Sequence, residues 1–404
     1  MIPRFKPYFN WDEIITILNK EEDAVTKFEK EFSNVMSSKH AVSFPSGRIG
    51  LFSLLETFGL KNKKIITPSY TCIVVPSAII ASKNYPCFVD ISLSDYNIEV
   101  DEISSITKDV KCIIPTHMYG NPADVKKLRD LVNDDTIIIE DAAQALLTKD
   151  VGKYGDAVFY SFNIEKQLFT FGGGMVTTNN EEIYEKLKNF RDKTYSKTTF
   201  FSELQKTFLL FNTPFIFSDS LFRWILALWN INGSSYWKRM GWSLKNLDLP
   251  VEKIYSISDY VGLYSRIQAS VGLSQLKKLK TSIEKRIEIA KYYNKNLENF
   301  DCITPSAIIN GSSFSHYTIR VNNRDDFESF MKKKGVQINK VFDYSTAHLP
   351  VFKKYTNKDQ QLKNSLTAGS NNVNLPSYPQ LLDKRHKLDH IIQSIKEYDK
   401  KINT

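Results

Sequence analysis

Short β-branched strands alternate with helix-length stretches through the first two thirds of this 404-residue chain. The strand-like runs lie at residues 64–68, 87–90, 111–115 and 136–141, and they end in Pro, Asp or Glu. This alternation is typical of βαβ units whose parallel sheet is buried on both faces. We therefore expect an α/β fold with a mostly parallel sheet between helices, and ligand-binding residues at the carboxyl ends of its strands.

The last third of the chain predicts a smaller α/β unit. The expected elements are a long helix over residues 264–297, a strand over 316–321, a helix over 324–334 and a closing helix over 382–401. We expect a large domain over residues 1–250, and a linking helix with a small C-terminal domain over residues 251–404. A hydrophobic content of 42% is sufficient for cores of this size.

Composition disfavours several classes of protein. The four cysteines show no CxxC pair and no zinc-like spacing, which is typical of reduced thiols in a cytoplasmic protein. No apolar signal-peptide core follows Met1, and no run of about 18 apolar residues exists, so we expect neither secretion nor a spanning helix. The net charge of +9 is spread along the chain, which favours a phosphate-rich ligand or an anionic membrane surface over nucleic acid.

The stretch that carries chemistry is Ser161-Phe162-Asn163-Ile164-Glu165-Lys166, which precedes three glycines at 172–174. Pyridoxal phosphate (PLP) enzymes need a lysine that forms a Schiff base, an acid beside the pyridinium nitrogen, and small residues that let the chain turn nearby. Asp141, within Glu140-Asp141-Ala142-Ala143-Gln144, ends the preceding strand and could supply the acid. Lys166 alone could be a solvated surface lysine, but with the acid, the serine and the glycines it indicates a PLP site.

Two further features support a ligand site at the strand ends. Residues 46–60 have helical spacing, and their Ser-Gly start predicts an anion-binding helix N-terminus. Asp90, His117 and Asp141 all follow strand ends, where site residues are expected. His117 could be either a buried structural histidine or a group that lines the site.

Eight short blocks of the sequence, in the order and at the spacing in which they occur, resemble those of the sugar aminotransferase family of the DegT/DnrJ/StrS type. These are PLP enzymes of the aspartate-aminotransferase fold (fold type I). The similarity extends from about Phe44 to Leu382 and is poor over residues 195–265. The matching blocks are residues 44–48, 68–71, 86–90, 117–120, 140–144, 161–166, 268–276 and 375–379.

The resemblance implies roles for individual residues. Lys166 would hold PLP and move a proton during transfer, Asp141 would pair with the pyridinium, and Gln144 would approach the phenolic oxygen. Ser161 and the amides at 47–48 would bind the phosphate. Asp141 could instead cap a helix that starts at residue 142, and Ser161 could be an ordinary strand hydroxyl. The expected cofactor-binding residues are Ser46, Gly47, Arg48, Cys72, Asp141, Gln144, Ser161 and Lys166, and no metal site is expected.

The chain also departs from the family pattern. Cys72 stands where the family has an aromatic residue over the pyridine ring, so the thiol, Tyr70 or another aromatic would cover the ring. Asn163 replaces a frequent histidine. The Asn-Tyr-Arg element that reaches the partner subunit's cofactor is missing, which leaves Arg266 as a guess for that contact. Because Lys166 is a lysine rather than the histidine of dehydrating relatives, transamination is favoured.

The resemblance therefore implies a homodimeric aminotransferase, with its site near the subunit interface. It would move an amine, from a donor such as L-glutamate, to a keto-sugar linked to a nucleotide. The product would serve the synthesis of cell-surface polysaccharide or lipopolysaccharide. The alternatives are another fold-type-I PLP reaction on an amino acid, or a non-catalytic PLP-binding relative.

An aromatic-rich insertion over residues 195–250 is not explained by the family pattern. Four of the five tryptophans lie there, and residues 221–229 have the spacing of one apolar helix face. One interpretation of residues 200–242 is burial in the large domain's core or in the dimer interface. The other is a helix at the inner face of the cytoplasmic membrane, where Lys238 and Arg239 would favour anionic lipid.

Overall fold

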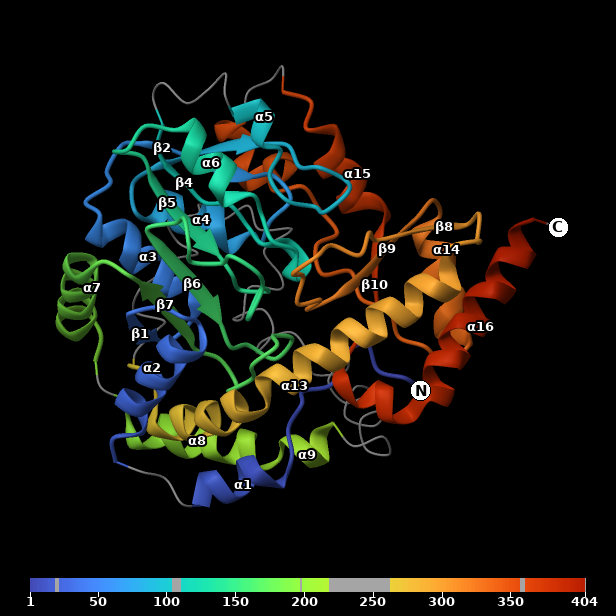
Figure 1. The fold of residues 1–404 in the computed structure, drawn as a ribbon, viewed down its shortest axis with the longest axis horizontal. Helices are drawn as coiled ribbons and strands as arrows, with labels where there is room; N and C mark the ends of the chain where they lie inside the picture. Colours follow the sequence, from blue (N-terminus) through green and yellow to red (C-terminus); the bar gives the residue numbers. More distant parts are fainter. Residues whose placement is uncertain (19–21, 104–109, 197, 218–261, 357–359, 404) are drawn as a thin grey trace.

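A seven-stranded sheet forms the centre of the larger part of the molecule, with its strands in the order β1-β7-β6-β5-β4-β2-β3 (Figure 1). The computed structural model describes residues 1–18, 22–103, 110–196, 198–217, 262–356 and 360–403. All neighbouring strands are parallel except β7, which is antiparallel to β1 and β6. The expectation of a mostly parallel sheet is confirmed. The strands are β1 (His40–Phe44), β2 (Lys64–Pro68), β3 (Tyr85–Val89), β4 (Val110–Ile113), β5 (Ile137–Asp141), β6 (Ala157–Ser161) and β7 (Gly174–Thr178).

Helices pack on both faces of this sheet, because successive strand residues point to opposite sides. Ile139 and Phe159 belong to one apolar cluster with Leu51. Their neighbours Ile138 and Val158 belong to clusters on the other face. The helices of this part are α1 (Trp11–Leu18), α2 (Ala24–Val35), α3 (Gly47–Thr57), α4 (Val74–Ala81), α5 (Val100–Ile103), α6 (Val125–Leu131), α7 (Glu181–Thr194), α8 (Phe200–Phe211) and α9 (Thr213–Ile216).

A second, antiparallel sheet in the order β10-β9-β8 lies at the C-terminal side of the molecule (Figure 1). Its strands are β8 (Ile303–Pro305), β9 (Tyr317–Val321) and β10 (Asn372–Leu375). The associated helices are α14 (Arg324–Lys333), α15 (Lys363–Asn371) and α16 (Arg385–Ile402), and 3-10 turns cover residues 118–120, 346–348, 350–355 and 379–384. The domain boundary that the sequence suggests, at residues 250–251, lies outside the described residues.

The long helix α13 (Arg266–Leu297) connects the two parts (Figure 1). Its N-terminal half packs on α2, where a Cβ at Gly272 would lie 2.6 Å from ring atoms of Phe28. Its C-terminal half enters the core of the small sheet through residues such as Tyr293. At its start, Gln268 Nε2 donates to the carbonyl oxygens of Thr170 at 3.1 Å and Gly172 at 3.2 Å. The 268–276 block therefore holds the glycine loop that follows Lys166.

The aromatic segment divides into a buried and an exposed face where the structure describes it. Leu210 and Phe217 are buried in a cluster with residues of α1 and α13. By contrast, Phe200, Phe201 and Phe208 are 85%, 75% and 67% exposed. Residues 218–242, which hold the four tryptophans, lie outside the described residues. Within the described ranges, no helix combines the length and the apolar character needed to cross a bilayer.

Candidate active site

One cavity of about 370 Å³ lies at the carboxyl ends of the large sheet's strands. Its lining comes from the loops after β1, β2, β5 and β6, joined by residues 338–344 of the C-terminal part. Seven of the eight expected cofactor-binding residues line it: Ser46, Gly47, Arg48, Cys72, Asp141, Ser161 and Lys166. The strand ends therefore bring together residues that are up to 120 positions apart in the chain.

The start of α3 forms an anion-binding end of this cavity. Ser46 is the N-cap, and its Oγ accepts a hydrogen bond from Ile49 N at 3.3 Å. Gly47 is required by close packing, because a Cβ there would lie 2.7 Å from the carbonyl oxygen of Tyr160. A Cβ at Gly174 would lie 2.3 Å from Gly47 N. The glycines let the helix N-terminus approach the end of β6, where its amides suit a phosphate.

Asp141 forms the buried acidic end of β5. Its Oδ1 accepts from Ala143 N at 3.0 Å, and its Oδ2 accepts from Thr116 Oγ1 at 3.5 Å. Burial raises the pKa of Asp141, and the hydrogen bond from Ala143 and the charge of Lys166 oppose this shift. Residues 142–150 form turns rather than a helix, so the helix-cap alternative is wrong, although the carboxylate does bond a nearby amide. A cation beside Asp141 would relieve the cost of burial, which fits a pyridinium nitrogen.

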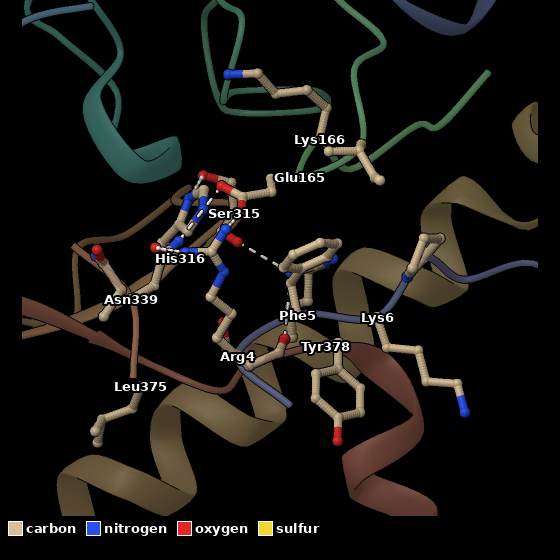
Figure 2. A pocket seen from close by; sticks show the side chains of 15 residues that line it. Arg4, Phe5, Lys6, Glu165, Lys166, Ser315, His316, Asn339, Leu375 and Tyr378 are labelled. Carbon is tan, nitrogen blue, oxygen red and sulfur yellow. Dashed lines mark hydrogen bonds and ion pairs between the residues drawn. The ribbon is translucent and has the colours of Figure 1, made fainter. Parts of the chain in front are cut away.

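Anchored residues flank Lys166 on both sides. Lys166 N donates to the carbonyl oxygen of Asn163 at 3.0 Å, which closes a tight turn. The next residue, Gln167, accepts from Leu146 N at 2.8 Å. The preceding residue, Glu165, pairs with Arg4 at 2.9 Å. Figure 2 shows that the Lys166 and Glu165 side chains extend in different directions from this turn. The backbone at Lys166 is thus fixed while its amine reaches the cavity that it lines.

The structure distinguishes between the groups that could cover a cofactor ring. Cys72 lines the cavity, and burial raises the pKa of its thiol. Tyr70 lies outside the lining, and its hydroxyl bonds the Tyr119 hydroxyl at 2.6 Å. Tyr344 does line the cavity and accepts from Ile73 N at 3.2 Å. Cys72 and Tyr344 are therefore the candidates for ring contact.

Other expected residues lie elsewhere. Gln144 does not line the cavity, and its Oε1 accepts from Tyr119 N at 3.1 Å. Asp90 accepts from the backbone amides at the start of α15. Arg266 lies outside the cavity lining, with its amide bonded to Glu203.

His117 is a buried structural histidine. Its Nδ1 accepts from Ala123 N at 3.0 Å, so its proton sits on Nε2 and is donated to Glu140 Oε2 at 2.8 Å. The same carboxylate also accepts from Gly152 N and Gly155 N. This network closes the loop between β5 and β6 beneath the site, and His117 does not line the cavity.

Several lining residues were not expected from the sequence. Arg4, His316, Asn339 and Lys340 come from the N-terminal segment and the C-terminal part. Arg4, Asn339 and Lys340 belong to irregular segments without helical or strand periodicity, and His316 directly precedes an expected strand of the other sheet, so no signal in the sequence indicated that they would line this cavity. Among the described residues, no group of three or more His, Cys, Asp or Glu side chains could hold a metal.

Comparison with known proteins points to one family. The model of the DegT/DnrJ/EryC1/StrS aminotransferase family matches residues 16–212 and 253–396. Protein MJ1066 of Methanocaldococcus jannaschii, which is uncharacterized, is 31% identical, and the match covers 95% of this chain and 94% of that protein. The GDP-perosamine synthase of Vibrio cholerae is 23% identical, with 93% and 90% covered. Streptococcus pneumoniae Spr1654 in its PLP form has the same fold, with a TM-score of 0.76, 20% identity and 100% of both chains covered.

A substitution at His117 tests its structural role. His117→Ala should lower the free energy of unfolding by about 2–4 kcal/mol, because it leaves the amide of Ala123 without its buried acceptor and removes one of the three donors to the buried Glu140 carboxylate. Urea unfolding would measure this, with the exposed His390→Ala as a control that changes stability little. Turnover per folded enzyme should stay within a few-fold of the original. A large loss of turnover with unchanged stability would make His117 catalytic.

Proposed function

The chain belongs to the DegT/DnrJ/EryC1/StrS aminotransferase family, and we propose that it transfers an amino group from L-glutamate to a nucleotide-linked keto-sugar. The expectations of an aminotransferase and of PLP as its cofactor are confirmed by the family and by the PLP form of Spr1654. The observation that carries the proposal is the shared cavity of Lys166, Asp141 and the start of α3.

The lining residues suit PLP, which supplies an electron sink for the carbon that gains or loses the amine. The first amides of α3 and the Ser161 hydroxyl would hold the phosphate, and Asp141 would stay ionised beside the ring nitrogen. Lys166 Nζ would bond the cofactor between turnovers. During transfer, Lys166 Nζ would accept the proton that leaves the carbon bearing the amine, and would return it in the second half of the reaction.

The sugar substrate is inferred from the relatives and from the shape and charge of the site. The GDP-perosamine synthase relative is named for a nucleotide-linked sugar. The cavity of about 370 Å³ is large enough for a sugar ring beside the cofactor, and Arg48 and Lys340 at its wall would favour an anionic substrate. We propose that the product enters cell-surface polysaccharide or lipopolysaccharide.

We also propose a cytoplasmic homodimer with the site near its interface. All four cysteines are free, which supports a reducing compartment. The apolar side chains of Phe200, Phe201, Leu204 and Phe208 on α8 are exposed, and α1, which contacts α8, exposes Trp11. Exposed apolar patches of this kind are typical of protein or membrane contacts. We assign this apolar face of α8 to the dimer, with docking on an anionic membrane as the alternative.

Replacement of Lys166 tests the proposed chemistry. Lys166→Ala should abolish the visible absorbance band of lysine-bound PLP and lower turnover by several orders of magnitude, since no other amine replaces Nζ. The measurement is glutamate-dependent bleaching of that band, followed by transfer to the keto-sugar. Lys153→Ala, at an exposed lysine of the preceding loop, serves as the matched control and should behave like the original. Near-normal transamination by Lys166→Ala would refute the site assignment.

The apolar face of α8 can be tested in solution. Sedimentation should give a dimer of the 46.6 kDa chain, and Phe201→Glu with Phe208→Glu should shift it toward monomer, because charges replace apolar contacts. Anionic liposomes at low and high salt provide the second measurement. The protein should stay at the bottom of the gradient at both salt concentrations. Flotation at low salt that is lost at high salt would contradict the dimer assignment and support the membrane alternative.

A further inference from the structure

A second, smaller cavity lies between the N-terminal segment, the turn of Lys166 and the C-terminal part (Figure 2). Its volume is about 20 Å³, and it shares Arg4, Glu165, Lys166 and His316 with the lining of the main cavity. A group bound in the main cavity could therefore extend a short anionic end into it.

The walls of the small cavity carry an excess of positive charge. Among the residues that line it, Arg4, Lys6, Lys166 and Arg286 are cationic, and Glu165 is the one carboxylate. Glu165 already pairs with Arg4. The pKa of His316 is held well below its usual range by burial and by the nearby charges of Lys166, Arg286 and Arg4, so His316 is neutral and adds no positive charge of its own.

Arg286 is the most informative of these cations. It comes from α13 and is only 7% exposed. Its Nη1 donates to the carbonyl oxygens of Ser315 at 3.0 Å and Ser377 at 3.2 Å. Within the described residues its Nε has no hydrogen-bond partner, and no carboxylate pairs with it. Burial lowers the pKa of Arg286 to about 10, and the group is still charged at neutral pH. A buried cation without a carboxylate partner is stabilised when an anion binds beside it.

Arg4 is held at the cavity by an N-terminal strap, residues 2–9. Ile2 pairs with Val336, and Ile2 N donates to the carbonyl oxygen of Gly335 at 2.7 Å. Gln380 Nε2 fixes the other end by donating to the carbonyl oxygen of Pro7 at 2.9 Å. The guanidinium then reaches Glu165 at 2.9 Å and Asn339 Oδ1 at 3.2 Å. The strap thus fixes a cation beside the turn of the reactive lysine.

The size of the cavity selects among anions. A space of about 20 Å³ holds one or two small groups, since a single water needs roughly 10–15 Å³ of this volume. This space matches the two oxygens of a carboxylate more closely than the four oxygens of a tetrahedral phosphate. Arginine also binds carboxylates in a bidentate geometry.

We propose that the small cavity binds a carboxylate of the amino donor, and that Arg4 and Arg286 recognise it. This inference rests on the proposed aminotransferase function and adds a residue-level account of donor choice. Glutamate has two carboxylates, of which either the α- or the γ-group could enter.

The test uses the holoenzyme and its two half-reactions. In rapid mixing, the concentration of L-glutamate that half-saturates bleaching should rise at least tenfold in Arg4→Gln, which corresponds to about 1.4 kcal/mol. The reverse half-reaction with the amino-sugar nucleotide should change less than threefold. Arg4→Gln with Glu165→Gln removes both charges of the pair and should show the same loss, with an unchanged melting temperature. Lys285→Gln is the matched control. It also removes one positive charge from α13, next to Arg286, but Lys285 pairs with Asp383 and does not line the small cavity.

Two amides of glutamate identify the carboxylate. L-glutamine lacks the γ-carboxylate and isoglutamine lacks the α-carboxylate, so the amide that has lost the recognised group should bind weakly and be indifferent to Arg4→Gln. The proposal is overturned if Arg4→Gln alters donor and sugar half-reactions equally, or if it changes glutamate binding less than threefold. If glutamate fails to bleach the original enzyme, the proposed donor is wrong. Calorimetry with the unreactive dicarboxylate glutarate, on the original and Arg4→Gln proteins, still decides the site.

Discussion

The buried carboxylate of Asp141 is the constraint on which the rest of the site depends. It ends a strand at the centre of the sheet, where burial raises its pKa, and the hydrogen bond from Ala143 and the charge of Lys166 are among the interactions that oppose this shift. A buried acid in this position is unfavourable without a cation opposite it. The pyridinium of PLP is such a cation. In the proposed site, bound cofactor would therefore relieve the electrostatic cost of burying this carboxylate.

Close packing of small residues places the other groups around that acid. Gly47 and Gly174 bring the start of α3 onto the end of β6, which no larger residue would allow. Gln268 of α13 holds the glycine loop through its carbonyl oxygens. The helix that links the two parts of the molecule therefore also holds the loop at residues 170–172 that follows Lys166. The N-terminal strap adds Arg4 from the opposite side.

The sequence predicts the sheet well because burial on both faces leaves a plain signal of β-branched runs. It also predicts Lys166, Asp141 and the start of α3, since strand ends and glycines mark them. It could not predict that Arg4, His316 and Tyr344 line the cavity, because they come from segments distant in the chain and outside the large sheet. The prediction for Gln144 failed for a different reason. Its spacing from Asp141 suits a helical turn, but residues 142–150 do not form a helix. The Gln144 side chain accepts a hydrogen bond from Tyr119 N instead of lining the cavity.

The charge of Asp141 can be removed with little change of shape. Asp141→Asn should still bind PLP through the phosphate end, while single-turnover bleaching by glutamate should slow by far more than tenfold. The expected loss exceeds about 1.4 kcal/mol of transition-state stabilisation, because the ring would lose the ion pair that keeps its nitrogen protonated. A slowing of less than tenfold would contradict this account and reduce Asp141 to a residue that only caps the turn at Ala143.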